Sequence, residues 1–337
     1  MCLIDERPLA PAPHRPVPHL AAGGPDWHPF LRTVPAQPVT AAKSATREDD
    51  RAVRLAGRAR RLIPGPVHDA LADFDHDSGP AGALLLRGLP VGSIPTTPAS
   101  PTAATGKDRT SEHLLLAVAR SLGHPVGYSA EHGGRVVQNL VPTREGAHRQ
   151  TSTSSAVELE FHTETAFHPH RPRYLLLVCL RGDPATRTLL CSVDELIGLL
   201  DDDVRRVLHE PRFRTGVDES FGPADRTASA GPAASVLSGD PERPILRFDA
   251  DLMTGTDPEA VAALAVLGRL ARAHRLGIAL EAGDLLVVDN HRCIHGRTAF
   301  AARFDGTDRW LQRSFVVSDL SASAADRTGP MITTTFA

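Results

Sequence analysis

The spacing of apolar residues changes along the chain, from helical near the start to strand-like in the second half. Between Arg47 and Leu62, apolar positions recur at helical spacing, with acidic residues first and basic residues last, as the helix dipole favours. A second helix is expected from Ser111 to Leu122, with Ser111 as its N-terminal cap. The apolar run at residues 82–89 predicts a buried strand.

The second half of the chain contains short runs of β-forming residues, each bounded by glycine, proline or aspartate. Helical spacing of apolar residues interrupts these runs at 193–209 and again at 258–276. Short strands separated by a few helices predict an α+β fold with a β-sheet core and flanking helices. The predicted strands of this half lie at 135–141, 157–162, 174–180, 189–192, 245–248, 284–288 and 310–317.

Two segments differ from the rest in composition. Residues 1–40 are rich in proline and have few periodic apolar positions, which indicates an arm on the surface or a disordered segment. Residues 222–244 are rich in glycine, alanine, serine and proline, and so long a loop inside a compact domain is typical of an active-site lid. The remainder, 41–337, is predicted to be a single domain whose β-core spans about 80–320.

The composition excludes several classes of partner. A formal net charge of −3 argues against a nucleic acid or an anionic membrane as the main partner, because binding either requires a basic surface. No window of the sequence approaches the roughly 18 apolar residues of a membrane-spanning helix. The four cysteines show no C-x-x-C spacing, and we interpret them as reduced thiols of a cytoplasmic protein.

Histidines and one carboxylate suggest a metal site. His162 and Glu164 are two residues apart at the end of a predicted strand, so both side chains are expected on one face. Far along the chain, His291 and His295 lie just beyond another predicted buried strand. Two histidines and one carboxylate that leave coordination positions open are the ligands of non-haem Fe(II) oxygenases. An isolated His-x-Glu is more often a solvated pair, so the downstream histidine is needed for this interpretation.

Arginines at the start of and within the last predicted strand could bind an anion. Arg309 follows His295 by fourteen residues, and a cation inside a β-core needs an anionic partner because burying it unpaired is costly. A dicarboxylate co-substrate, held end-on by the planar guanidinium, would be such a partner. The simpler alternative is an exposed ion pair with Asp305 or Asp308, and Arg313 has the same alternative.

Long motifs in collinear order relate the chain to a known family. They are VELEFHTETAFHPHRP (157–172), CLRGDP (179–184), VDESF (217–221), RFDADLM (247–253), VVDNHRCIHGR (287–297) and RFDGTDRWLQRSF (303–315). On these motifs the chain resembles the clavaminate synthase-like group of Fe(II)/2-oxoglutarate-dependent oxygenases. Within that group it is most similar to bacterial 3-hydroxylases of free arginine, asparagine and enduracididine. The similarity covers roughly residues 80–320.

The resemblance implies a fold, a metal and two co-substrates. The expected fold is a double-stranded β-helix, the jelly-roll or cupin-like core, with flanking helices and a lid. His162, Glu164 and His295 would bind Fe(II), whereas His291 has no counterpart among the family's ligands. The co-substrates would be 2-oxoglutarate and O2, with Arg309 and Thr188 holding the distal carboxylate of 2-oxoglutarate.

The resemblance also implies a pocket for an amino acid. Arg313 would hold the substrate α-carboxylate, and Gln138 and Ser152 would line the pocket. Asp249 and Asp251 match acids that meet the guanidinium in arginine-specific relatives. Both aspartates could instead cap the turn that starts at Leu252, because short acids are frequent in turns. Thr188 could likewise be present only for its β-propensity.

Hydroxylation of a free L-amino acid is therefore expected, at Cβ of arginine or of a cyclic guanidino amino acid such as enduracididine. The setting would be peptide-antibiotic or other specialised metabolism. Asparagine or lysine are alternative substrates, and desaturation, cyclisation or double hydroxylation are alternative outcomes with the same ligands. A non-catalytic, cupin-like binding protein is the alternative of another class. A monomer or a homodimer is expected.

Overall fold

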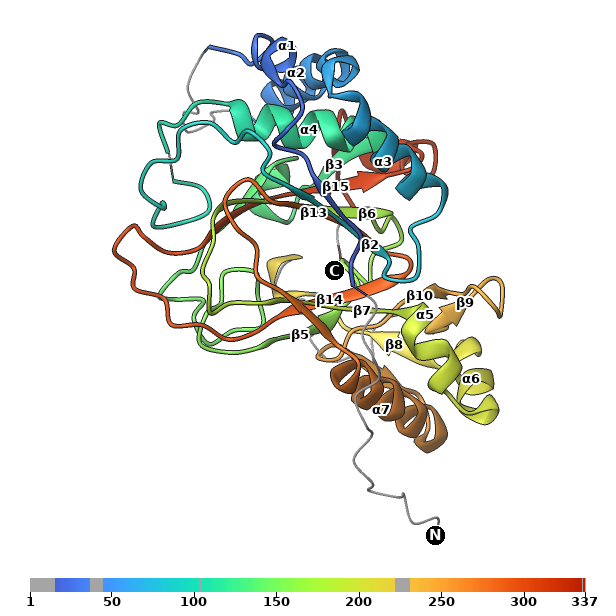
Figure 1. The fold of residues 1–337 in the computed structure, drawn as a ribbon. Coiled ribbons are helices and arrows are strands. Elements are labelled where there is room, and N and C mark those ends of the chain that lie inside the picture. Colours follow the sequence, from blue (N-terminus) through green and yellow to red (C-terminus); the bar gives the residue numbers. More distant parts are fainter. Residues whose placement is uncertain (1–15, 37–44, 104, 222–230, 335, 337) are drawn as a thin grey trace.

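The computed structural model describes residues 16–36, 45–103, 105–221, 231–334 and 336. Within these residues two sheets face each other and form the core (Figure 1). The larger sheet runs in the order β1-β2-β13-β6-β15-β3-β17-β16, with β4 paired to β15. Its strands are β1 His19–Ala21, β2 Ala83–Arg87, β3 His124–Tyr128, β4 Gln138–Leu140, β6 Tyr174–Arg181, β13 Leu285–Asp289, β15 Trp310–Val317, β16 Arg327–Thr328 and β17 Met331–Ile332.

The smaller sheet has the order β12-β7-β14-β5, and all of its pairings are antiparallel. Two short ribbons, β8 with β11 and β9 with β10, lie beside it. Two facing sheets of largely antiparallel strands confirm the predicted double-stranded β-helix core. The strands are β5 Leu159–His162, β7 Thr188–Ser192, β12 Leu276–Ile278, β14 Cys293–Arg297, β8 Phe213–Thr215, β9 Leu237–Ser238, β10 Ile245–Leu246 and β11 Met253–Gly255.

Helices cover the outer faces of both sheets (Figure 1). Helices α1 to α4 lie on the larger sheet, and α5 to α7 lie beside the smaller one. The α-helices are α1 His28–Leu31, α2 Ala45–Ala59, α3 Gly65–His76, α4 Thr110–Leu122, α5 Val193–Leu196, α6 Asp202–His209 and α7 Pro258–Ala273. The short 3-10 helices are η1 Arg60–Leu62, η2 His132–Gly134, η3 Ile197–Leu199, η4 Glu219–Phe221 and η5 Ala324–Asp326.

The side chains of strand β15 point alternately into two hydrophobic cores, one on each face of the larger sheet. Trp310 and Val316 pack with the helices on the outer face of the larger sheet. Leu311 and Phe315 pack between the sheets. Because successive side chains of a strand point to opposite faces, the odd-numbered positions 309 and 313 also face the space between the sheets. A third core lies between the smaller sheet and α5 to α7.

Two predicted helices differ from those observed. Helix α4 begins at Thr110, and the buried Ser111 hydroxyl donates to Gln312 at 2.7 Å instead of capping the helix. The expected helix at 193–209 is broken into α5, η3 and α6, because Leu200 and Asp201 have extended backbone. Three successive aspartates favour a new helix N-terminus at that point.

The described parts of the predicted arm and lid pack into the fold. Residues 19–21 form β1, which pairs in parallel with β2, and Trp27 and Phe30 are buried in the core under the helices. Of the predicted lid, residues 222–230 lie outside the described residues. Val236 and Leu237 are fully buried in the core with α6 and α7, whereas residues 238–243 of the same segment are exposed.

Two further expectations concern the cysteines and a membrane. The cysteines within the described residues, Cys179, Cys191 and Cys293, are buried free thiols. No helix in the described part of the chain has the length and apolarity needed to cross a membrane.

Candidate metal centre and active site

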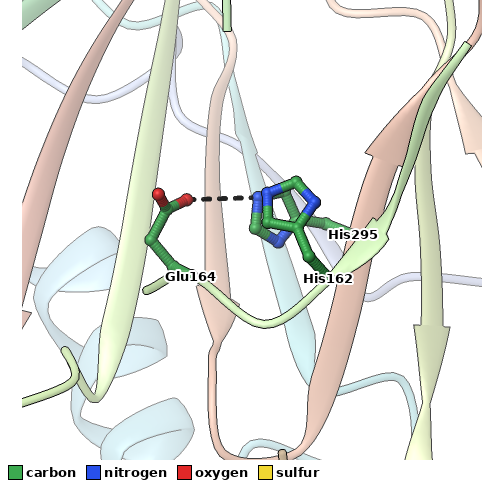
Figure 2. Close-up of side chains that lie close together, drawn as sticks. All are labelled: His162, Glu164 and His295. Atoms are coloured by element: carbon green, nitrogen blue, oxygen red, sulfur yellow. Dashed lines mark ion pairs between the residues drawn. The ribbon is translucent and has the colours of Figure 1, made fainter. Parts of the chain in front are cut away.

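Three side chains predicted as metal ligands meet between the sheets. His162 ends β5 and is the direct cross-strand partner of His295 on β14, which places their ring centroids 4.3 Å apart. Glu164 follows in the loop after β5 and turns toward both rings (Figure 2). Its Oε2 lies 3.3 Å from Nε2 of His295, and the three potential ligand atoms lie within 4.8 Å of one another. In the described residues no other such group of three is found.

The protonation states of these side chains suit a cation. Nδ1 of His162 lies 2.8 Å from the backbone oxygen of Glu160, and this contact leaves Nε2 as the ring nitrogen that can reach a metal. Burial lowers the pKa of His295 to about 4, so this imidazole is neutral at pH 7. Burial alone would raise the pKa of Glu164, but the charge of Arg313, and then the neighbouring His295, outweigh burial and lower this pKa to about 2.

An unsatisfied atom shows that the group fits a metal. Oε2 of Glu164 is buried and has no hydrogen-bond partner among the described residues, although it faces an imidazole nitrogen. A buried acceptor without a hydrogen-bond partner is costly unless a cation lies beside it. Two imidazoles and one carboxylate are the ligands that non-haem Fe(II) uses when coordination positions must stay open.

The loop that carries Glu164 is held by a residue that sequence reasoning missed. The side chain of Asn290 accepts from the Glu164 backbone N–H at 2.6 Å and donates to the Glu164 carbonyl at 3.1 Å. It also donates to the carbonyl of Pro172 at 3.0 Å, at the far end of the same loop. Asn290 lies in the quoted VVDNHRCIHGR motif, but only histidines of that motif were considered as metal ligands.

The predicted co-substrate residues also come together. Arg309 and Thr188 line the same cavity as the three ligands, and Nη2 of Arg309 lies 3.4 Å from the Thr188 hydroxyl. No ion pair of Arg309 with Asp305 or Asp308 is found among the described residues. Asp308 instead accepts the backbone N–H groups of residues 303 and 304. The guanidinium is therefore available to an anion in the cavity.

Comparison with known proteins identifies the family. The family described as taurine catabolism dioxygenase TauD, TfdA family matches residues 81–315, more than half of the chain. The chain belongs to this dioxygenase family. It is 40% identical to L-lysine 3-hydroxylase of Catenulispora acidiphila, over 77% of this chain and 74% of that enzyme. It is 36% identical to clavaminate synthase 2 of Streptomyces clavuligerus, over 84% of this chain and 88% of that enzyme.

A solved structure agrees with these relatives. The non-heme iron oxygenase OrfP, in complex with Fe, succinate and (3S)-hydroxy-L-Arg, superimposes with a TM-score of 0.82 at 29% identity. The match covers 94% of this chain and all of OrfP, which has also been solved with Fe and α-ketoglutaric acid. These findings confirm the predicted resemblance. The protein is an Fe(II)- and 2-oxoglutarate-dependent dioxygenase.

Arg313 of the dioxygenase is surrounded by acceptors. Its guanidinium donates to Oε1 of Glu164 at 3.1 Å, to Oε1 of Gln138 at 3.0 Å through Nε, and to Glu131. Gln138 was expected to line the pocket but lies behind Arg313 as its partner and is not among the cavity-lining side chains. Glu131 does line the cavity and was missed, because it lies in a segment without periodic pattern.

The two aspartates of the RFDADLM motif have different surroundings. Asp249 is buried, and its Oδ1 accepts the backbone N–H groups of Asp251 and Leu252 at 2.9 and 2.8 Å, which is the expected turn cap. Burial raises the pKa of Asp249 to about 6. Asp251 is exposed, and both residues line the cavity of the dioxygenase together with Ser152. Capping and contact with a ligand are thus compatible at this position.

A wider hollow of about 760 Å³ adjoins the cavity. Glu131 and Ser152 line both spaces, so they stand at the junction between the buried dioxygenase site and the outside. On the far side, Arg149 and Glu219 form an ion pair across the hollow's rim. The hollow and the cavity therefore adjoin at Glu131 and Ser152.

Proposed function

We propose that this dioxygenase hydroxylates a free basic L-amino acid at Cβ, with His162, Glu164 and His295 as its iron ligands. Arginine or a cyclic guanidino amino acid such as enduracididine is the preferred substrate, and lysine is the main alternative. Support comes from the geometry of the three side chains, the pocket charges and the activities of the relatives. One relative acts on L-lysine, and OrfP is solved with hydroxylated L-arginine.

The arrangement of Glu131, Arg313 and Glu164 carries the proposal. Arg313 bridges the two carboxylates, and all three side chains are buried in the cavity wall. Oε2 of Glu131 is buried without a hydrogen-bond partner among the described residues. A buried guanidinium beside an unsatisfied carboxylate oxygen is complementary to an α-carboxylate beside an α-ammonium group. An amino acid with both termini free is the substrate class with that pair of charges.

The same arrangement supports attack near the α-carbon. Arg313 is one hydrogen bond from Glu164, so an α-carboxylate bound to Arg313 lies close to the proposed metal. Holding both charged groups of the α-carbon leaves the side chain as the part of the substrate that can extend along the cavity. Cβ is the first carbon of that side chain, which favours it as the site of hydroxylation.

Further acids favour a cationic side chain. Asp218, Asp249 and Asp251 line the cavity, and Asp218 is held by the backbone N–H and hydroxyl of Ser220 at 2.8 and 2.6 Å. Arg309 and Arg313 are assigned to the two acids of the co-substrate and substrate. A guanidinium or ammonium group at the end of the substrate side chain would be complementary to these three carboxylates.

These contacts suggest a separate role for the iron and for each group of side chains in the reaction. Iron would couple the decarboxylation of 2-oxoglutarate to succinate with the insertion of oxygen into a C–H bond. His162, Glu164 and His295 leave positions open for the co-substrates. Arg309 and Thr188 would hold the distal carboxylate, while Glu131 and Arg313 would orient the amino acid.

Mass spectrometry on purified enzyme tests the proposal. The enzyme would be incubated with Fe(II), 2-oxoglutarate and each free L-amino acid, including enduracididine. A product heavier by 16 mass units from a basic amino acid, with matching succinate, is expected. Nα-acetyl-arginine is the matched control and should remain unchanged because it lacks the ammonium group. Turnover of only neutral amino acids, or equal turnover of the acetylated substrate, would refute the substrate assignment.

The alternative outcomes are read in the same experiment. A loss of 2 mass units would show desaturation or ring closure, and a gain of 32 would show double hydroxylation. The iron ligands are identical in all of these reactions, so the product and not the metal site separates them.

A further inference from the structure

A second arginine lies beside the proposed 2-oxoglutarate site. Arg297 is on β14, two residues after His295, so both side chains point to the same side of the smaller sheet and both line the cavity. In the pairing of β14 with β7, Arg297 is the direct cross-strand partner of Thr188. Directly opposed residues have Cβ atoms only about 5 Å apart. Thr188 is therefore a neighbour of both Arg297 and Arg309.

The Arg297 guanidinium is held in place by neutral groups. It donates to the carbonyls of Ser154 and Val157 at 2.5 and 2.9 Å and to the Ser154 hydroxyl at 3.0 Å. It also stacks over the ring of Phe300, with 5.0 Å between the guanidinium carbon and the ring centre. Its side chain is 5% exposed and makes no ion pair within the described residues. The charge of Arg297 is thus buried without a carboxylate, unlike that of Arg313.

Two such charges close together require an anion. Arg309 is half-buried and also makes no ion pair in the described part of the chain, although the charge of Asp183 acts on it. A guanidinium stays protonated in proteins, so Arg297 carries a positive charge at pH 7. Buried like charges are unfavourable unless a compensating charge lies beside them. A ligand with a single carboxylate on iron would leave this end of the cavity uncompensated.

We propose that Arg297 is a second cation of the co-substrate site, which makes the enzyme select a dicarboxylic 2-oxo acid over a monocarboxylic one. Arg309 and Thr188 bind the distal carboxylate directly. Arg297 acts through its fixed charge, because most of its N–H groups already donate to Ser154, Val157 and the carbonyl of Thr298. The inference rests on the proposed co-substrate site at Arg309 and assigns to Arg297 the part of the selectivity that Arg309 does not supply.

Ligand binding without turnover tests this role. Dissociation constants of 2-oxoglutarate and of 2-oxopentanoate, which has a methyl group in place of the distal carboxylate, would be measured anaerobically with Fe(II) from the charge-transfer absorption. Arg297→Gln should raise the dissociation constant of 2-oxoglutarate about tenfold and that of 2-oxopentanoate less than about threefold. This is the size of effect expected for one charge acting at an intermediate effective dielectric. Arg297→Lys should keep the wild-type affinity for 2-oxoglutarate within about threefold.

A structural role predicts different results. If Arg297 only holds Ser154 and Val157 in place, Arg297→Lys would not restore the binding of 2-oxoglutarate. Arg297→Gln would then weaken the binding of 2-oxoglutarate and 2-oxopentanoate by the same factor. Ser154→Ala would also weaken the binding of both acids. Any of these outcomes, or no change in Arg297→Gln, would overturn the proposal. Circular dichroism and the thermal midpoint would establish that each variant is folded.

A third variant keeps the test decisive if Arg297→Gln does not fold. In Arg309→Gln the second cation remains, so the variant should still prefer 2-oxoglutarate over 2-oxopentanoate by about tenfold. Complete loss of that preference would show that Arg309 alone discriminates in favour of the distal carboxylate of 2-oxoglutarate. Absence of 2-oxoglutarate binding to wild-type enzyme would instead contradict the co-substrate site itself, which distinguishes the two failures.

Discussion

Replacement of Glu131 by glutamine isolates the proposed contact with the substrate ammonium group. Glu131 is 5% exposed, contacts Arg313, and keeps a second carboxylate oxygen without a partner among the described residues. Glutamine has nearly the same shape, and its amide oxygen can still accept from Arg313. The substitution therefore removes a negative charge while it preserves the packing and one hydrogen bond.

The expected loss follows from the kind of contact removed. A hydrogen bond that involves charged groups contributes about 1.5–3 kcal/mol, and a factor of ten in affinity corresponds to about 1.4 kcal/mol. KM for the amino acid should therefore rise about 10- to 100-fold in Glu131→Gln. Binding of 2-oxoglutarate should stay within about twofold, because Arg309 and Thr188 are on another part of the wall. Steady-state kinetics with succinate detection measure the first, and anaerobic titration measures the second.

The pH dependence gives an independent readout. Burial raises the pKa of Glu131 to about 7, although the charge of Arg313 opposes this effect. Only the ionised carboxylate binds an ammonium group, so kcat/KM should rise with pH through about 7 and level off above it. Glu131→Gln should lack this rise.

Two results would refute the reasoning about Glu131. One is a KM for the amino acid within twofold of wild type, and the other is an unchanged rise of kcat/KM near pH 7 in the variant. Glu145→Gln removes a carboxylate from the exposed rim of the outer hollow and serves as the matched control. It should leave both quantities unchanged.

Further predictions concern the metal, the co-substrate and the side-chain end of the substrate. His162→Ala should abolish succinate formation and lower Fe(II) affinity at least tenfold while circular dichroism stays unchanged; retained turnover would remove this residue from the ligand set. Asn290→Ala removes the hydrogen bonds that hold the Glu164 loop and should weaken Fe(II) binding about 10- to 100-fold in equilibrium titrations. An unchanged affinity for Fe(II) would contradict the positioning role of Asn290. Arg309→Gln should weaken 2-oxoglutarate at least tenfold by anaerobic titration, and equal binding would contradict its assignment. Asp249→Asn keeps an oxygen for the turn, so the thermal midpoint should hold while KM rises several-fold more for arginine than for asparagine; equal increases would argue against a cationic end group.

The metal site was accessible from the sequence because its parts are local or repeat a simple period. His162 and Glu164 are two residues apart, and Arg309, just before a predicted strand, is four residues from Arg313 in it, so each pair was expected to share a face. His295 was selected by its place in a long motif. That it pairs directly with His162 across β5 and β14 depends on strand register, which no local pattern contains.

Other functional residues were not accessible. Glu131 precedes a short 3-10 turn in a segment without apolar periodicity, and it reaches Arg313 across 182 positions of sequence. Asn290 and Arg297 lie within a recognised motif, but their partners near residues 154–172 come from another part of the chain. Their contacts are made only when the segments around β5 and β14 come together in the smaller sheet.

By itself, the sequence determined the elements of this protein, the face on which each predicted ligand lies, and its family. Backbone periods and side-chain chemistry act over a few residues, so these features can be read locally. Only the tertiary structure decided which charges are buried together, how Arg313 is shared between Glu131 and Glu164, and where Arg297 lies relative to Thr188. The reason is physical: burial and the electrostatic coupling that follows from it are properties of neighbours in space, and sheet pairing brings those neighbours from distant segments.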